Sequence, residues 1–147
     1  MLYILAVAFI VALDRFTKVC VEKKLKLGQS KELIKGKAYL RHVKNKGAAF
    51  GFLSGKPRAL KILSISSILM LIYYSPQVFR GNNKLQKSFL SMVIGGAIGN
   101  LYDRHKNKSV TDFLFIKFKN APIFNIADIF IFLGSLGIFF DSLKNGE

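Results

Sequence analysis

The chain has 147 residues, of which 51% are hydrophobic, and its formal net charge at pH 7 is +15. A basic charge of this size is typical of proteins that bind nucleic acid. Here, however, the apolar residues come in blocks of about 20 residues, the length that crosses the hydrocarbon core of a bilayer. The composition therefore excludes nucleic acid as a partner and favours a single membrane-embedded domain over residues 1–147.

The first apolar block, residues 2–21, predicts a membrane-spanning helix. We expect this helix to be retained, because no basic segment precedes the apolar run and no small-residue cleavage site follows it. Asp14 and Lys18 are four residues apart, so they share one helix face. Two interpretations are open: an ion pair near the helix end with Lys18 extending to the membrane interface, or a pair that faces the protein interior and supports a functional site.

The segment 22–58 is polar and basic, with eleven Lys or Arg against two Glu. Glycines separate short runs of β-forming residues, so we predict a β-rich region over about 27–58 that lies on the membrane surface. Its cations either hold anionic lipid headgroups or form an ordinary solvated face. Asn45 and Gly47 belong to its most distinctive stretch, VKNKGAAFGF, in which small residues allow the backbone to approach a ligand closely.

Three further apolar blocks predict membrane-spanning helices at about 59–79, 86–102 and 124–143. Pro76 is expected to kink or end the first of these helices. The second contains the small-residue run GGAIG from Gly95, which in membranes favours close helix packing. The predicted fold class is therefore an all-α membrane protein with four transmembrane helices and a small β-rich region at the surface.

Polar residues gather at the ends of two predicted helices. Asn100, Asp103 and Arg104 fall at positions i, i+3 and i+4 and so share one face, on which we expect Asp103 to form an ion pair with Arg104. Asn125 and Asp128 are three residues apart in the first turns of the last helix, and they also share a face.

Asp112 lies in residues 110–118, whose β-branched and aromatic content predicts a short extended segment. Two aspartates brought close together can share one proton, because like charges a few ångströms apart do not both ionise. The ionised partner takes a proton from water, while the protonated partner polarises a carbonyl and then protonates the leaving amine. Asp112 and Asp128 are the natural pair for this aspartic protease chemistry, which requires neither a metal nor a cofactor.

Other interpretations of the polar residues stay open on the residue types alone. No Gly-x-Ser-x-Gly elbow, His-Glu-x-x-His motif or phosphate-binding loop is present, although the composition does not exclude a Ser/Lys dyad. In a non-enzymatic scaffold, the polar groups would only hold helices together. In a small proton- or ion-coupled carrier, Asp14, Asp112 and Asp128 would be relay sites. The sequence shows no internal repeat of the kind that carriers commonly have.

Five blocks of the sequence resemble motifs of one known family, the lipoprotein signal peptidases or signal peptidase II, and they occur in that family's order. The blocks are DRFTK at 14–18, VKNKGAAFGF at 43–52, GGAIGNLYDR at 95–104, VTDF at 110–113 and FNIAD at 124–128. Two positions depart from the family pattern: Arg15 stands where Gln is common, and Ser109 stands where Gly is common.

The resemblance implies a membrane aspartic endopeptidase that removes signal peptides from prolipoproteins just before a diacylglyceryl-modified Cys. It implies that Asp112 and Asp128 are catalytic and that no metal or cofactor takes part. It also implies four transmembrane helices, a small β-rich extracytoplasmic cradle and a loop over the active site. The other matched residues are expected to support the site or bind substrate: Asp14, Lys18, Asn45, Gly47, Asn100, Asp103, Arg104 and Asn125.

By the same resemblance we expect the bacterial cytoplasmic (inner) membrane as the location, with both termini in the cytoplasm and the active site near the outer face. Loop charges conflict with this orientation, because residues 22–58 carry eleven Lys or Arg and residues 103–123 carry five, which the positive-inside rule would place in the cytoplasm. We follow the family, since the basic loop belongs to a folded region. The expected partners are a lipid-modified prolipoprotein and anionic membrane lipids, and we expect a monomer.

Overall fold

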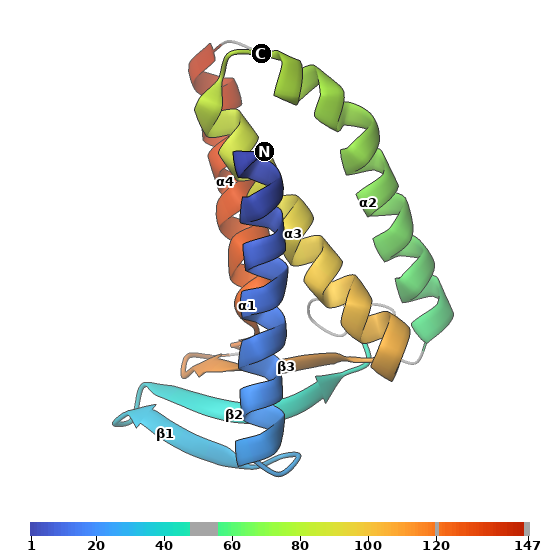
Figure 1. The fold of residues 1–147 in the computed structure, drawn as a ribbon. Coiled ribbons are helices and arrows are strands. Elements are labelled where there is room, and N and C mark those ends of the chain that lie inside the picture. The colour runs from blue at the N-terminus through green and yellow to red at the C-terminus, as the bar shows by residue number, and fades with distance from the viewer. Residues whose placement is uncertain (48–55, 120, 146–147) are drawn as a thin grey trace.

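Four helices and a four-stranded sheet make up the computed structural model over the residues it describes, 1–47, 56–119 and 121–145 (Figure 1). In chain order the elements are α1 (Leu2–Lys24), β1 (Ser30–Ile34), β2 (Ala38–Asn45), α2 (Pro57–Arg80), α3 (Lys84–Asn107), β3 (Val110–Ile116), β4 (Ile123–Phe124) and α4 (Ile126–Asn145). Helices α1, α3 and α4 stand together, and the sheet crosses one end of them (Figure 1). The prediction of a mainly helical fold with a small sheet is therefore confirmed.

Helix α2 runs through Pro76 to Arg80, so the proline does not end it. Proline has no N–H, which leaves the carbonyl of Ile72, four residues earlier, without its usual helical donor. The hydroxyl of Ser75 donates to that carbonyl at 2.8 Å. A neighbouring hydroxyl thus replaces the lost backbone bond, as is common for prolines in membrane helices.

Local capping sets the ends of α3 and α4 at positions that differ from the predicted spans. Helix α3 begins just after Asn83, whose side chain accepts a hydrogen bond from the N–H of Gln86 at 3.0 Å. It continues to Asn107, five residues beyond the predicted end, and the chain then turns at Lys108 in the left-handed conformation (φ 54°). The residue with positive φ in this turn is therefore Lys108, and not Ser109, which stands where Gly is common in the family. Helix α4 starts at Ile126, two residues after the predicted start, because Ile123 and Phe124 pair in the sheet.

The sheet is antiparallel throughout, with strand order β1-β2-β3-β4. Strands β1 and β2 lie within the predicted β-rich region of about 27–58, of which residues 48–55 are outside the described residues. Strands β3 and β4 extend the sheet with residues far along the chain. Lys44 lies opposite Thr111, and Asn45 lies opposite Val110. This register places the end of β2 beside Asp112 on β3. The polar end of the first hairpin thus meets one of the candidate catalytic aspartates.

Small residues on α3 allow its neighbours to approach closely, which confirms the predicted close packing. A Cβ at Gly96 would lie 2.4 Å from the backbone oxygen of Ala127 on α4, and a Cβ at Gly99 would lie 2.7 Å from Oδ2 of Asp14 on α1. Real Cβ atoms essentially never come this near to such atoms. Glycine at these two positions therefore permits α3 to contact both helices beside the polar residues.

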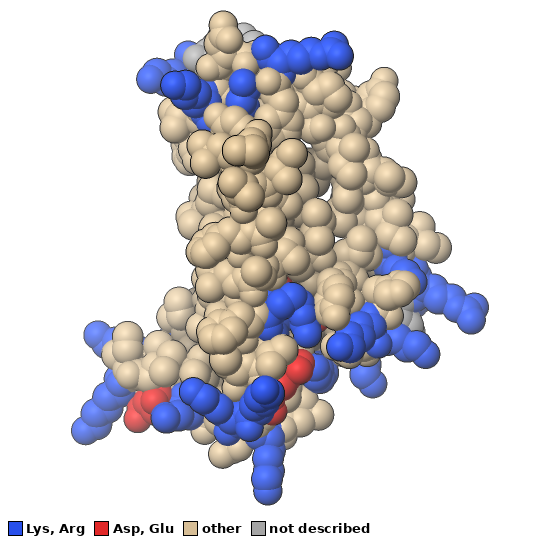
Figure 2. Space-filling model, viewed as in Figure 1, with Lys and Arg blue, Asp and Glu red and all other residues tan. Residues whose placement is uncertain are grey.

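Charge on the visible face is confined to the two ends of the helices, and an uncharged band covers the middle (Figure 2). Large apolar side chains are exposed on the helices, including Phe9 on α1, Leu69 on α2 and Phe132 on α4. Among the described residues, α2 (over 58–80) and α4 (over 126–144) are long and apolar enough to cross a membrane. Exposed apolar surface of this extent is typical of a protein that contacts lipid.

Candidate active site

Asn125 and Asp128 cap the first turn of α4. The side-chain oxygen of Asn125 accepts from the N–H of Asp128 at 2.9 Å, and Oδ2 of Asp128 accepts from the N–H of Asn125 at 3.2 Å. This reciprocal arrangement has the form of a capping box, in which two residues three apart satisfy each other's free backbone donors. Both side chains are thereby fixed at the point where α4 leaves the sheet.

The carboxylate of Asp112, on β3, is held by two side-chain amides. Asn45 donates to its Oδ2 at 2.8 Å, and Asn125 donates to its Oδ1 at 2.7 Å. The side chain is almost fully buried, and burial together with the charge of Asp128 raises the pKa of Asp112 to about 6. The two amide donors and the charge of Lys18 act against this rise by stabilising the ionised form.

Asn100 on α3 connects Asp128 to the interior of the helix bundle. Its amide nitrogen donates to Oδ1 of Asp128 at 2.7 Å. Its oxygen accepts from Asn125 at 3.2 Å and from Nζ of Lys18 at 3.1 Å. A buried amide that uses donors and acceptors in this way fixes its own orientation and that of its neighbours.

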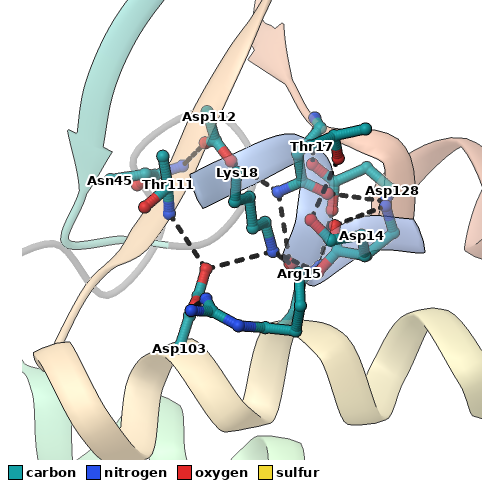
Figure 3. A network of polar contacts seen from close by, with 12 residues as sticks. Asp14, Arg15, Thr17, Lys18, Asn45, Asp103, Thr111, Asp112 and Asp128 are labelled. Atoms are coloured by element: carbon teal, nitrogen blue, oxygen red, sulfur yellow. Dashed lines mark hydrogen bonds and ion pairs between the residues drawn. The ribbon is translucent and has the colours of Figure 1, made fainter. Parts of the chain in front are cut away.

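Asp14, Arg15, Lys18 and Asp103 form a cluster of four charged side chains (Figure 3). Lys18 joins this cluster to Asn100. Nζ of Lys18 lies 2.7 Å from Oδ2 of Asp14 and 3.1 Å from Oδ2 of Asp103, and none of these three side chains is exposed. Arg15 donates to the other oxygen of Asp103. The Asp14–Lys18 pair therefore faces the protein interior, as one of the two interpretations predicts, and Lys18 does not extend to the membrane interface.

Asp103 pairs with Lys18 and Arg15, so the expected ion pair between Asp103 and Arg104 is wrong. Residues adjacent on a helix do not face the same neighbour. Asp103 faces α1, while Arg104 lines a cavity together with Asp112. The sequence spacing placed both residues at the correct helix end but did not reveal which of them points toward α1.

Asp14 also contacts the start of α4. Its Oδ1 accepts from the N–H of Ala127 at 3.0 Å. The first N–H groups of a helix have no partner within the helix, so a buried acceptor here satisfies a group that would otherwise be unpaired. The buried charge cluster is thereby joined directly to the residue before Asp128.

A cavity of about 990 Å³ contains both candidate catalytic aspartates in its lining. Gly47 also lines it, and its N–H donates to Oδ1 of Asn45 at 2.8 Å. Residues 48–52, the remainder of the VKNKGAAFGF stretch, lie outside the described residues. The polar and charged side chains in the lining are Asn45, Asn100, Arg104, Asp112, Lys119, Asp128 and Ser135. Val110 and apolar residues of α4 and of 118–124 complete it.

The predicted site residues thus fall into two adjoining groups. Asn45, Gly47, Asn100, Arg104, Asp112 and Asp128 line the cavity. Asn125 connects both aspartates, and Asp14, Lys18 and Asp103 form the charge cluster beside them.

Sequence reasoning missed two residues that belong to this network. Arg15 is a partner of Asp103, and its position beside Asp14 in an apolar block was the available signal. The fully buried Thr111 donates its N–H to Asp103 at 3.3 Å, and no feature of the sequence besides its place before Asp112 indicated this.

Fold and site together define a helical membrane protein with one buried and one partly exposed aspartate, Asp112 and Asp128, in the lining of one cavity, the equipment of an aspartic hydrolase. Among the described residues, no group of three or more His, Cys, Asp or Glu is arranged to hold a metal ion.

Comparison with known proteins identifies the family. The family model described as signal peptidase (SPase) II matches residues 6–144. The lipoprotein signal peptidase of Clostridium novyi is 35% identical over 147 residues, which cover 98% of this chain and 99% of that protein. The corresponding protein of Caldicellulosiruptor bescii is 40% identical over 146 residues, covering 99% and 93%. The chain belongs to the signal peptidase II family.

Solved structures agree with this assignment. A bacterial membrane enzyme structure obtained by the in meso method at 2.3 Å resolution matches with a TM-score of 0.88 and 32% identity, covering 99% of this chain and 89% of that one. A second such structure, at 1.9 Å resolution, matches with a TM-score of 0.84 and 33% identity, covering 97% and 92%. The resemblance noted in the sequence is confirmed: the protein is a bacterial membrane enzyme, an aspartic peptidase that removes signal peptides from prolipoproteins.

Proposed function

We propose that Asp112 and Asp128 are the catalytic dyad with which this peptidase cleaves its substrate just before the lipid-modified cysteine. One observation carries the proposal: both carboxylates line the same cavity and Asn125 binds each of them. The side-chain amide of Asn125 donates to the carboxylate of Asp112, and the backbone N–H of Asn125 donates to the carboxylate of Asp128. The side-chain oxygen of Asn125 also accepts from the N–H of Asp128. Burial and the charge of Asp128 raise the pKa of Asp112 to about 6, which suits Asp112 to hold the proton that the pair shares.

The reaction then needs only one water molecule and the two aspartates. The carboxylate of Asp128 takes a proton from the water, whose oxygen attacks the scissile carbonyl carbon. Asp112 donates a hydrogen bond to the carbonyl oxygen, which stabilises the oxyanion of the tetrahedral intermediate. Collapse of the intermediate re-forms the carbonyl and breaks the C–N bond, and Asp112 gives its proton to the leaving amine. The proton that Asp128 took from the water then passes to Asp112, which restores the starting state.

Neighbouring residues divide into substrate-facing and positioning groups. Asn45, Gly47 and Arg104 line the cavity and are suited to bind the peptide backbone. Asn100 and Asn125 hold the dyad by direct hydrogen bonds. Three charged residues support α4 and Asn100 from within the bundle: Asp14, Lys18 and Asp103.

The chain is proposed to form one domain, residues 1–147, that crosses the membrane four times. Helices α1 and α3 have 23 and 24 residues, so each is at least as long as the apolar spans of α2 and α4, which have 23 and 19 residues. Three of their charged residues, Asp14, Lys18 and Asp103, are fully buried, which lowers the cost of placing these helices in lipid. The start of α1 and the end of α4 lie at the end of the bundle opposite the sheet (Figure 1).

Both termini are proposed to be cytoplasmic. This orientation places the sheet and the active site, with the family's overlying loop, at the outer face. Loop charges predict the reverse. A reporter fused after Glu147 separates the two: activity of a cytoplasmic reporter fits the proposed orientation, and activity of an extracytoplasmic one contradicts it.

The basic sheet is proposed to bind anionic lipid headgroups, each nearby Lys or Arg contributing about 1 kcal/mol. The enzyme is proposed to act as a monomer, because the cavity and both aspartates belong to one chain. Activity in vesicles with and without anionic lipid tests the first statement. The mass of the active particle in detergent tests the second.

The dyad is tested with purified protein in detergent and a lipidated prolipoprotein. Asp112→Asn and Asp128→Asn are each expected to abolish cleavage. Asp141→Asn is the matched control, because Asp141 lies on α4 near its far end and contacts Asn83 rather than the cavity. Wild-type cleavage by either dyad variant would overturn the assignment.

A further inference from the structure

We propose that Glu22, Lys44 and Thr111 form a positioning triad that fixes the sheet against α1 and thereby sets the place of Asp112. The three side chains come from the last turn of α1, from β2 and from β3. This inference rests on the proposed dyad. Lys44 and Thr111 lie within two of the matched blocks, and Glu22 lies outside them. None of the three is among the site residues that the resemblance implies, and none lines the cavity.

Each member of the triad contacts the other two. Nζ of Lys44 donates to Oε1 of Glu22 at 2.5 Å and to the hydroxyl of Thr111 at 2.8 Å. The hydroxyl of Thr111 in turn donates to the same Glu22 oxygen at 2.7 Å. Thr111 is fully buried, whereas the side chains of Glu22 and Lys44 are 29% and 27% exposed. The hydroxyl of Thr111 has one hydrogen, which it donates to Glu22, so its oxygen is the acceptor for Lys44.

The triad occupies the face of the sheet opposite to the cavity. Successive side chains on a strand point to opposite faces, so Thr111 and Asp112 do so on β3, and Lys44 and Asn45 do so on β2. Lys44 lies directly across from Thr111. One face of the strand pair therefore binds α1, while the other presents Asp112 and its hydrogen-bond donor Asn45 to the cavity.

Thr111 is held through its backbone as well as its hydroxyl. Its N–H donates to Oδ2 of Asp103 in the buried charge cluster. Both anchors of this residue lead to α1, one through Glu22 and the other through the Lys18–Asp103 pair. The residue next to Asp112 is consequently tied to the helix that also contacts the start of α4 through Asp14.

Loss of the triad would allow β3 to move away from α1 and would admit water to Asp112. The charged groups acting on Asp112 are Asp128 on α4, Lys18 on α1 and Arg104 on α3. Asn45 and Asn125 are its hydrogen-bond donors. Since burial is the largest cause of its raised pKa, hydration would lower the pKa of Asp112. The proton shared by the dyad would then be lost at a lower pH.

The test measures kcat, KM and their pH dependence for Thr111→Val in detergent. We expect kcat to fall about 10- to 100-fold, the effect of a misplacement near 1 Å, with KM within about two-fold of wild type. The alkaline limb of the pH profile of kcat is expected to move to lower pH. Thr111→Ser is expected to restore both kcat and the position of this limb. A purely structural role would lower the unfolding temperature but leave the limb in place, and that result would overturn the inference.

Two further variants decide the matter if Thr111→Val does not fold. Glu22→Gln and Lys44→Met change partly exposed groups, so they are expected to fold and to move the limb in the same direction. Glu32→Gln, on the exposed strand β1, and Lys84→Met, at the exposed start of α3 outside the sheet, are their matched controls and should match wild type. If the alkaline limb does not move in Glu22→Gln and Lys44→Met, or moves equally in the two controls, the triad is refuted and the dyad is not. Activity of Asp112→Asn would instead refute the dyad.

Discussion

Replacing Gly96 with Ala adds one methyl group at the contact between α3 and α4. Its Cβ would lie 2.4 Å from the backbone oxygen of Ala127, whereas ordinary contact begins at 3.4 Å. A backbone oxygen in a helix cannot turn aside, so the helices must separate by about 1 Å at the residue before Asp128. The hydrogen bond of 2.7 Å from Asn100 to Asp128 would then be stretched or lost.

A displacement of this size near reacting groups costs about 100-fold in rate, and overpacking costs about 1–3 kcal/mol of stability. The assay compares initial rates of prolipoprotein cleavage and thermal unfolding in detergent for wild type, Gly96→Ala and a control, Gly81→Ala. Gly81 has negative φ, and its added Cβ would meet nothing closer than 3.4 Å, so the control should behave as wild type. A wild-type kcat for Gly96→Ala would refute the claim that close α3–α4 contact positions Asp128.

Two other substitutions probe the buried charges and the amide donors. Lys18→Met leaves Asp14 without its cation and should lower the free energy of unfolding by about 3–5 kcal/mol. The double variant Asp14→Asn/Lys18→Met should recover much of that loss in the same unfolding assay. Equal stability of the single and double variants would contradict the assigned ion pair. Asn45→Ala removes a donor that stabilises ionised Asp112, so the alkaline limb of the kcat/KM profile should move to higher pH, and a shift to lower pH would contradict the assigned hydrogen bond.

Short-range features of the site were predictable from the sequence because they depend on local geometry. Asn125 and Asp128 are three residues apart, and this spacing alone favours both the shared face and the capping interaction that the structure contains. The small residues around Gly96 likewise predicted close packing. Even the predicted strand at 110–118 follows from its residue types and agrees with β3.

Long-range partners were not predictable because they depend on how the helices rotate and pack. Arg15 and Asp103 are 88 positions apart, and their contact requires a particular rotation of α1 against α3. The choice between an interfacial and a buried Lys18 depends on Gly99, which leaves room for Asp14 beside α3. The pairing of β2 with β3 joins residues 67 positions apart, so the place of Thr111 became evident only from the structure.

The shared proton of Asp112 and Asp128 is tested most directly by titrating Asp112 itself. Carbon-13 NMR of protein labelled at its aspartate carboxyls, in detergent, should give a pKa for Asp112 of about 6. In Asp128→Asn the neighbouring negative charge is gone, so the pKa of Asp112 should fall below its wild-type value. A wild-type pKa near 4, or a value unchanged in Asp128→Asn, would contradict the account of two aspartates coupled in one active site.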